Sequence, residues 1–264
     1  MFLVAVAEAR DLAREAQPLA ELLGVAAYDV KLWLGGALPR VVTQTASREE
    51  ADAVAQAIRA RGHGVLVADA STIVTGDVIA VKRLAIDDTS IGRAEAPDER
   101  LPYGSMGALV HVANRTDVEH VTREKDLVSD AAASRRPQTV VRERTTHSHT
   151  MEHVLYVFPV DALRPWVIDE SRTRYVGLGA AMKPTAHENF FTTIQLLRER
   201  AQSAPYDDRF VAAPRVVHRV VRTTTARGTA PEIDAEHGDP SVHLLALWLM
   251  RGRGGPYRDA AEMR

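Results

Sequence analysis

The 264-residue chain contains no cysteine, few aromatic residues (5%) and no excess of either charge. Without cysteine it has no disulfide, no thiol nucleophile and no cysteine-ligated zinc or iron–sulfur centre. The formal net charge of −2 provides no electrostatic reason to bind nucleic acid or an anionic membrane. We therefore expect no nucleic-acid partner, no membrane partner and no cofactor.

Long hydrophobic runs are also missing, since a helix that crosses a bilayer needs about 20 apolar residues. The apolar start, residues 1–7, is too short for a signal peptide and has no basic residue, so the expected location is the cytoplasm. The strongest later run, residues 242–250, follows Pro240 at a helix-opening position and predicts a short helix that is apolar nearly all round. Such a helix must be buried, either on its own domain or against a partner or second subunit. The sequence leaves the oligomeric state open.

Residues that end helices or begin new elements mark the first 68 residues as a small α/β unit. Gly24 separates two apolar helical segments, and Gly35 ends the second. Pro39 precedes a strand, and Ser47-Arg48-Glu49-Glu50 has the Ser-x-x-Glu pattern of a capping box for a third helix, which ends at Gly62. The expected strands cover residues 2–7, 40–45 and 65–68. The predicted order is β-α-α-β-α-β.

This order, and the residues that carry it, resemble the C-terminal domain of the bacterial ribosomal stalk protein, a fold shared with the adaptor of the Clp protease. The matching residues are Leu23-Gly24-Val25, Lys31, Pro39-Arg40-Val41-Val42, Ser47-Arg48-Glu49-Glu50-Ala51 and Gly62-His63-Gly64-Val65. The resemblance covers about a quarter of the chain and implies a module, residues 1–70, whose relatives bind proteins through their second and third helices. Only Lys31 remains of the family's lysine-rich helix, and the dimerising domain and hinge are missing, so we do not interpret the chain as a ribosomal protein.

The helical face of this module is the first candidate partner-binding surface. The resemblance places Tyr28, Lys31 and Leu32 on it, with Arg59 or Arg61 nearby. If Trp33 enters the core, Tyr28 and Leu32 form an outward stripe at i and i+4. Tyrosine and arginine are typical anchors of protein interfaces, so we expect a protein or peptide partner with an acidic or apolar segment.

The rest of the chain predicts a second, β-rich domain over residues 76–213. Strands are expected over residues 77–86, 101–103, 106–112, 139–146, 154–159 and 166–168. An amphipathic helix over residues 187–200 closes this domain, residues 114–137 are expected to form a polar loop, and residues 214–264 a tail that carries the short apolar helix. The overall fold class is therefore α+β, with a small α/β module followed by a β-rich domain closed by a helix.

Within this domain, Val78-Ile79-Ala80-Val81-Lys82-Arg83-Leu84, followed by Leu101-Pro102-Tyr103 and a run to Leu109-Val110, resembles bacterial pleckstrin-homology-like domains. The resemblance covers about half the chain. Asp87-Asp88 makes the strand-turn loop acidic, where phosphoinositide-binding members of the family are basic. The resemblance therefore implies binding of a peptide or protein.

The run from Thr146 to His153 is the sharpest candidate for chemistry. His147 and His149 fall on one face of an extended strand, and His153 follows four residues later, which is a possible metal triad. The run is similar to the metal motif of cupin barrels, HxHxxxE, but His153 stands where the family has its glutamate. His187 is a possible fourth ligand. The alternative is that these are ordinary loop and strand-edge histidines.

A second partner-binding candidate is the segment Arg172-Thr173-Arg174-Tyr175, which precedes flexible glycines. In the alternative interpretation Tyr175 packs under the following helix and has only a structural role. Asp169-Glu170 beside these arginines is either an acid/base pair or a solvated charged turn. Together these features predict a non-enzymatic, cytoplasmic protein-interaction or adaptor protein. The alternative is a metal-dependent enzyme that uses His147, His149 and His153.

Overall fold

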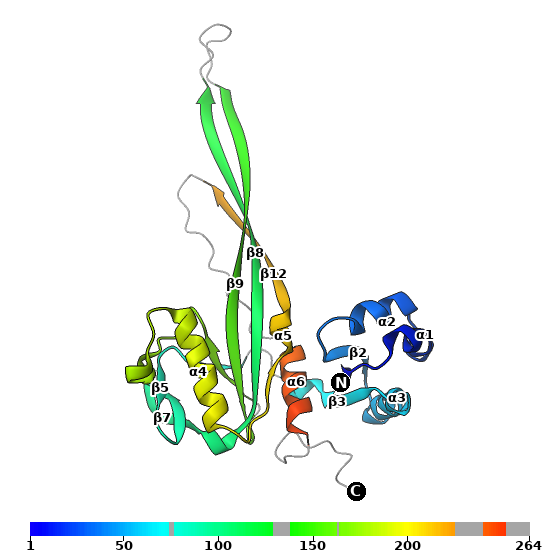
Figure 1. The fold of residues 1–264 in the computed structure, drawn as a ribbon. Coiled ribbons are helices and arrows are strands. Elements are labelled where there is room, and N and C mark those ends of the chain that lie inside the picture. Colours follow the sequence, from blue (N-terminus) through cyan, green and yellow to red (C-terminus); the bar gives the residue numbers. More distant parts are fainter. Residues whose placement is uncertain (74–76, 129–137, 163, 225–239, 252–264) are drawn as a thin grey trace.

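The structure, a computed structural model, describes residues 1–73, 77–128, 138–162, 164–224 and 240–251, and within these ranges the side chains of 116–128, 138–148 and 214–224 are not described. It contains both helices and several sheets, so the predicted α+β class is confirmed. Figure 1 shows a small helical unit at the N-terminus, a β-rich body and a long ribbon of strands that extends from this body.

The N-terminal unit has the predicted order of elements. These are β1 (Phe2–Glu8), α1 (Leu12–Leu23), α2 (Ala27–Leu34), β2 (Arg40–Thr45), α3 (Arg48–Ala60) and β3 (Gly64–Asp69). The strands form one antiparallel sheet in the order β2-β1-β3, with β1 in the centre. The three helices cover one face of this sheet, and Val4, Val6, Leu19 and Ile58 are fully buried between the two layers.

The local signals act as expected at the ends of these helices. Gly24 ends α1 in the left-handed conformation (φ 67°), which glycine adopts without steric cost. The Ser47 hydroxyl accepts a hydrogen bond from the Glu50 amide at 3.1 Å and so caps α3.

The β-rich body contains two further sheets. Its strands are β4 (Ile79–Ala80), β5 (Leu84–Ile86), β6 (Ser90–Arg93), β7 (Ala96–Pro102), β8 (Met106–Val128), β9 (Gln138–Pro159), β10 (Trp166–Asp169), β11 (Tyr206–Asp208) and β12 (Ala213–Thr224). The larger sheet has the order β11-β8-β9-β10-β4, with β12 also paired to β8, and the smaller has the order β5-β6-β7. Its helical elements are η1 (Ala70–Thr72), η2 (Tyr103–Ser105), η3 (Val176–Ala181), α4 (Ala186–Arg200) and α5 (Arg209–Ala212). The predicted closing helix is α4, whose Phe190, Ile194 and Leu197 enter the core between the sheets.

Two expectations for this region need correction. The polar segment after Asn114 is not a loop as far as Val128, because β8 continues through it and pairs with β9. Residues 129–137 of the expected loop lie outside the described residues. The expected strand over 77–86 is interrupted and contributes to two different sheets as β4 and β5. The sequence of this polar segment shows no apolar face, so it did not predict a strand. Pairing with the long strand β9 nevertheless satisfies the hydrogen-bonding groups of its backbone.

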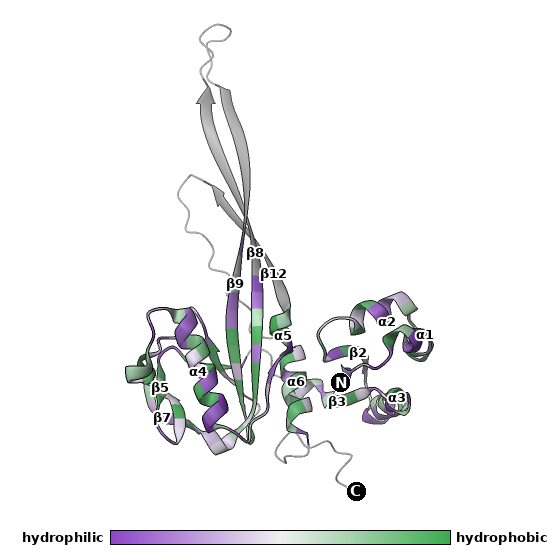
Figure 2. Cartoon of the chain, in the orientation of Figure 1, coloured by the Kyte–Doolittle hydropathy of each residue, from purple (hydrophilic) through white to green (hydrophobic). Residues whose placement is uncertain are grey.

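Two described parts of the predicted tail form regular elements. The first is β12, and the second is α6 (Pro240–Met250), which lies between the N-terminal sheet and the larger sheet (Figure 1). Leu244 packs with the outer face of β1 and β3, whereas Val242, Leu245 and Met250 pack against β8 and β9. This double burial explains why α6 is hydrophobic nearly all round (Figure 2).

Two glycines allow α6 to approach both sheets closely. A Cβ on Gly64 of β3 would stand 2.7 Å from the Trp248 ring, and one on Gly107 of β8 would collide with the Met250 sulfur. The apolar helix thus docks within its own chain and joins the two units. No helix in the described ranges combines the length and apolar character needed to cross a membrane.

Candidate functional sites

The predicted outward stripe on α2 is present. Tyr28 and Leu32 are 73% and 62% exposed, Lys31 between them is exposed, and Trp33 turns partly into the core. Leu22, at the end of α1, is also exposed (39%). We call Tyr28, Lys31 and Leu32 the α2 surface.

The arginines expected near this surface have other roles. The Arg59 guanidinium donates two hydrogen bonds to the Val65 carbonyl, at 3.3 and 3.0 Å. Arg61 forms an ion pair with Glu15 at 2.7 Å. Both therefore secure α3 within the module, and Lys31 is the basic residue that the α2 surface retains.

The second predicted partner site is only partly at the surface. Arg172 and Arg174 are exposed, but Tyr175 is buried (5% exposed) and its hydroxyl hydrogen-bonds the backbone carbonyls of Asp169 and Glu170, at 3.1 and 3.2 Å. Burial, followed by the charges of these two acidic residues, raises the pKa of Tyr175. The assignment of Tyr175 to a partner surface is therefore wrong, and it packs under α4 as the structural alternative proposed.

The predicted histidine triad does not converge. His147, His149 and His153 all lie on β9, and the side chain of His147 lies outside the described side chains. Because a strand rises about 3.3 Å per residue, His149 and His153 are separated by roughly 13 Å along β9. His149 is exposed, whereas His153 is half-buried and turned towards a neighbouring strand. One metal ion cannot bind both.

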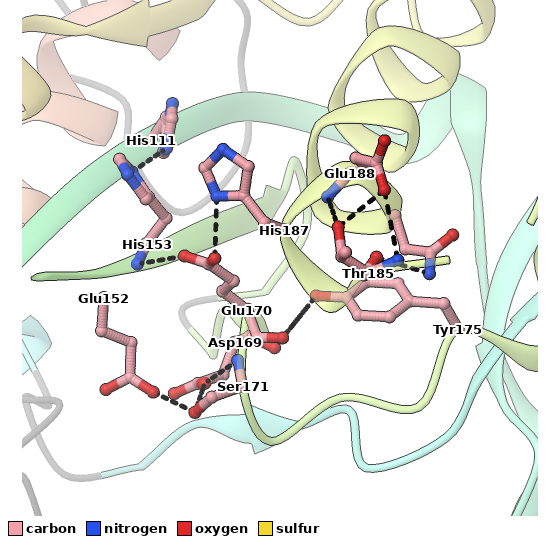
Figure 3. Close-up of polar contacts among 11 residues, drawn as sticks. His111, Glu152, His153, Asp169, Glu170, Ser171, Tyr175, Thr185, His187 and Glu188 are labelled. Atoms are coloured by element: carbon pink, nitrogen blue, oxygen red, sulfur yellow. Dashed lines mark hydrogen bonds and ion pairs between the residues drawn. The ribbon is translucent and has the colours of Figure 1, made fainter. Parts of the chain in front are cut away.

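His153 instead belongs to a hydrogen-bonded chain under α4. Its Nδ1 lies 3.0 Å from Nε2 of the buried His111 on β8, and His111 Nδ1 lies 3.0 Å from the Tyr206 hydroxyl on β11 (Figure 3 shows the two imidazoles). Phe190 and Phe191 of α4 pack on the His111 ring, at centroid distances of 5.4 and 5.7 Å. These hydrogen-bonded side chains therefore link β9, β8 and β11 beneath the two phenylalanine rings.

Burial shifts the pKa of each of the three side chains in this hydrogen-bonded network. It lowers the pKa of His111 from 6.5 to about 4, with a further contribution from repulsion by His153. Burial likewise lowers the pKa of His153, which Glu170 partly opposes, and raises the pKa of Tyr206 to about 12. With a pKa of about 4, His111 is neutral at neutral pH, so it can donate or accept a hydrogen bond with His153 according to its tautomer.

Glu170 lies beside this network, where it contacts the backbone of His153 and the side chain of His187 at the protein surface. Its Oε1 lies 2.9 Å from His187 Nδ1, at the start of α4, and its Oε2 accepts a hydrogen bond from the His153 amide at 3.1 Å (Figure 3). The Glu170 side chain is 16% exposed and that of His187 is 60% exposed. In the neutral form of His187 the carboxylate holds the proton on Nδ1, which leaves Nε2 as the nitrogen able to accept a proton, the tautomer that a general base requires.

A second acidic group lies on the other side of Glu170 (Figure 3). The Ser171 hydroxyl donates to Glu152 and also contacts the buried Asp169, whose Oδ1 accepts hydrogen bonds from the Ser171 and Arg172 amides at 3.0 and 3.1 Å. Burial and the nearby carboxylate of Asp169 raise the pKa of Glu152. The root of the ribbon therefore combines three carboxyl groups with a carboxylate-bound imidazole, a set of groups able to transfer protons.

Within the described side chains, no three histidine, aspartate or glutamate residues are arranged to hold a metal ion. Sequence analysis considered His153 and His187 together as possible metal ligands, but it did not connect either of them with the Asp169-Glu170 pair. It missed His111 and Tyr206, since a single histidine in an apolar strand and a tyrosine in a short one are not distinctive. Only the pairing of β8 with β9 and β11 brings them together.

Comparisons with known proteins add no family assignment. No family model, curated protein or solved structure matches the chain. The resemblances to the stalk-protein domain and to pleckstrin-homology-like domains therefore remain predictions, and the candidate sites must be judged from their own geometry.

Proposed function

We propose that the chain is a protein-interaction or adaptor protein that binds its partner through the α2 surface. The observation that supports this proposal is the exposure of Tyr28 and Leu32, which lie one helical turn apart with Lys31 beside them. Monomeric surfaces carry scattered apolar residues, but an aromatic and an aliphatic side chain in one stripe have the composition of an interface core, and a lysine beside them fits its polar rim.

The surrounding packing makes this surface rigid. Val30 and Leu34 of the same helix are buried in the module core, so α2 cannot turn its outward stripe inward. A rigid helix loses little conformational entropy on binding, which favours a helical or extended segment as the partner. Lys31 favours an acidic residue within that segment.

Site-specific crosslinking tests the proposal. A photoreactive phenylalanine analogue replaces Tyr28 in the full chain, and crosslinked products are identified after illumination in cells that produce the protein. We expect one dominant product, which is lost when Leu32→Ala and Lys31→Glu are added. Each interface anchor contributes about 1–2 kcal/mol, so the double change lowers affinity by at least about tenfold.

The same analogue at Gln56, an exposed position of α3, is the matched control. A product common to both positions reports nonspecific contact. The proposal is refuted if Leu32→Ala and Lys31→Glu leave the Tyr28 product unchanged while circular dichroism shows an intact fold.

The Glu170–His187 pair favours acid–base catalysis as a second candidate function. A carboxylate that fixes the Nδ1 tautomer of an exposed imidazole is the arrangement of a general base. Hydrolysis of p-nitrophenyl acetate measures the reactivity of this imidazole, which attacks the ester carbonyl and releases p-nitrophenolate before water hydrolyses the acyl-imidazole. A rate above that of free imidazole, lost in Glu170→Gln as well as in His187→Gln, supports catalysis, and a rate equal to that of free imidazole refutes it.

A further inference from the structure

Four basic residues meet where the connection between β4 and β5 runs beside the turn that precedes η3. Arg83 forms an isolated parallel bridge with Arg174. In this bridge the Arg174 amide donates to the Lys82 carbonyl at 2.8 Å, and the Leu84 amide donates to the Arg174 carbonyl at 2.9 Å. Directly paired residues point to the same side, with their backbones about 5 Å apart. Both arginines are exposed, as are the adjacent Lys82 and Arg172, and we call these four residues the basic patch.

Burial alternates along the segment that carries two of these arginines. Thr173 and Tyr175 are each 5% exposed, whereas Arg172, Arg174 and Val176 are exposed, Val176 to 50%. The three exposed residues therefore form an outward row, in which successive members are at most about 7 Å apart. The sequence indicated the two arginines of this row, but the bridge adds Arg83 and its neighbour from a distant segment of the chain.

Little acidic charge compensates the basic patch within the described part of the chain. Arg172 lies 3.9 Å from the Asp169 carboxylate and also interacts with the charge of Glu152. The other three members form no ion pair with any described residue. Glu95 accepts a hydrogen bond from a backbone amide of the patch, but its carboxylate is paired with Arg93 at 3.2 Å. Most of the positive charge of the patch is therefore available to a ligand.

We infer that the basic patch binds an extended acidic segment of a partner protein, with Arg83 and Arg174 as its anchors. Like charges directly opposite each other on paired segments are destabilising, so a carboxylate between the two guanidinium groups removes a repulsion and adds charge-assisted hydrogen bonds. Alternate side chains of an extended peptide point to one side about 7 Å apart, which is compatible with the row that ends at Val176. The row therefore fits a segment with the pattern acidic-x-acidic-x-apolar, in either chain direction. The exposed apolar member favours a peptide over a nucleic-acid backbone, whose repeating unit is charged throughout.

The backbone under the patch is rigid, which lowers the entropic cost of binding. The Thr173 hydroxyl accepts a hydrogen bond from the Asp169 amide at 3.1 Å and donates one to the Val81 carbonyl at 2.8 Å. Gly177 packs so closely on β5 that a Cβ would stand 2.6 Å from a backbone oxygen of that strand, so the preceding Val176 is held beside β5. The exposed side chains are thus presented from a fixed backbone.

Fluorescence anisotropy of the full chain with labelled peptides of about ten residues, at about 50 mM salt, tests the patch. In one peptide two glutamates and an isoleucine occupy alternate positions between threonines, and in the second peptide glutamine replaces glutamate. We expect the glutamate peptide to bind at least tenfold more tightly than the glutamine peptide. An Arg83→Gln, Arg174→Gln double variant should weaken binding of the glutamate peptide at least tenfold, whereas Arg83→Lys with Arg174→Lys, which keeps both charges, should retain part of the affinity.

Arg14→Gln with Arg40→Gln is the matched control, because it removes the same charge from two exposed positions of the N-terminal unit. It should leave the affinity unchanged, and so should Tyr28→Ala, which separates this site from the α2 surface. Three results would each overturn the inference: no binding of the glutamate peptide by the wild type, equal losses in the Arg83/Arg174 and Arg14/Arg40 glutamine variants, or equally tight binding of an oligothymidylate with the same number of charges. The last result would identify a site for any polyanion.

Discussion

Acidification should destabilise the fold through His111, the buried imidazole between Tyr206 and His153. Burial holds its pKa at about 4, compared with about 6.5 in an unfolded chain. Between these two values the unfolded state binds more protons than the folded state, so the free energy of unfolding falls as the pH is lowered. The contribution is fully present above about pH 6.5 and is lost as the pH falls towards 4.

The geometry explains why protonation is unfavourable. Each nitrogen of His111 has a partner at 3.0 Å, and the partner on the Nε2 side is the imidazole of His153. When both His111 and His153 are in the charged form, the N–H at Nε2 of His111 and the N–H at Nδ1 of His153 point at each other. Glu170 and Asp208 favour the charged form of His111, but burial outweighs them. A change in pKa from 6.5 to about 4 corresponds to roughly 3 kcal/mol, since each tenfold change in the equilibrium is worth about 1.4 kcal/mol.

Urea unfolding, followed by tryptophan fluorescence between about pH 7.5 and pH 4, measures this contribution. The wild type should lose about 3 kcal/mol more than His111→Gln across this range. Tyr206→Phe is the matched control, because it removes the hydrogen bond at Nδ1 but keeps the buried imidazole. It should lower stability by about 1 kcal/mol at every pH and retain most of the pH dependence. Equal pH dependence in the wild type and His111→Gln would refute the reasoning.

Three further changes test the packing and the helix cap, all measured as free energies of unfolding at neutral pH. Ser47→Ala removes the cap of α3 and should cost about 1 kcal/mol, whereas Ser47→Asp should restore most of it. Gly64→Ala forces a Cβ against the Trp248 ring and should cost about 1–3 kcal/mol, while Gly104→Ala, which meets no atom within 4 Å, should cost much less; equal losses would contradict the close approach of α6. Tyr175→Phe removes the hydroxyl that hydrogen-bonds two backbone carbonyls and should cost about 1 kcal/mol, and no loss would mean that solvent replaces these bonds.

The N-terminal module was predictable because its signals are local. A glycine at the end of α1, a cap at Ser47 and apolar residues at helical spacing each act within a few positions of the chain. The outward stripe of Tyr28 and Leu32 followed from helix geometry once Trp33 was assigned to the core. The burial of Tyr175 was one of two open interpretations, because a tyrosine before a glycine-rich turn is compatible with a surface or with a core position.

The histidine chain and the ribbon depend on pairings between distant residues. His111 and His153 are 42 residues apart and meet only because β8 and β9 pair in one register. A shift of one residue would turn all the side chains of one strand to the opposite face. Neither residue type nor periodicity specifies this register. The same limit applies to β12, whose parallel pairing with β8 crosses about 100 residues of sequence.

The position of α6 shows how a pattern that is ambiguous in sequence becomes specific in the fold. A short helix that is apolar on all sides is equally compatible with one domain, two domains or a partner chain. Here Leu244 lies on the N-terminal sheet and Leu245 on the larger sheet, so adjacent residues, about 100° apart around the helix, face different units. Replacing the apolar residues on either face of α6 with polar ones would leave the sheet under that face without an apolar cover. The module that carries the α2 surface and the sheet that continues into the ribbon are therefore stabilised by the same helix.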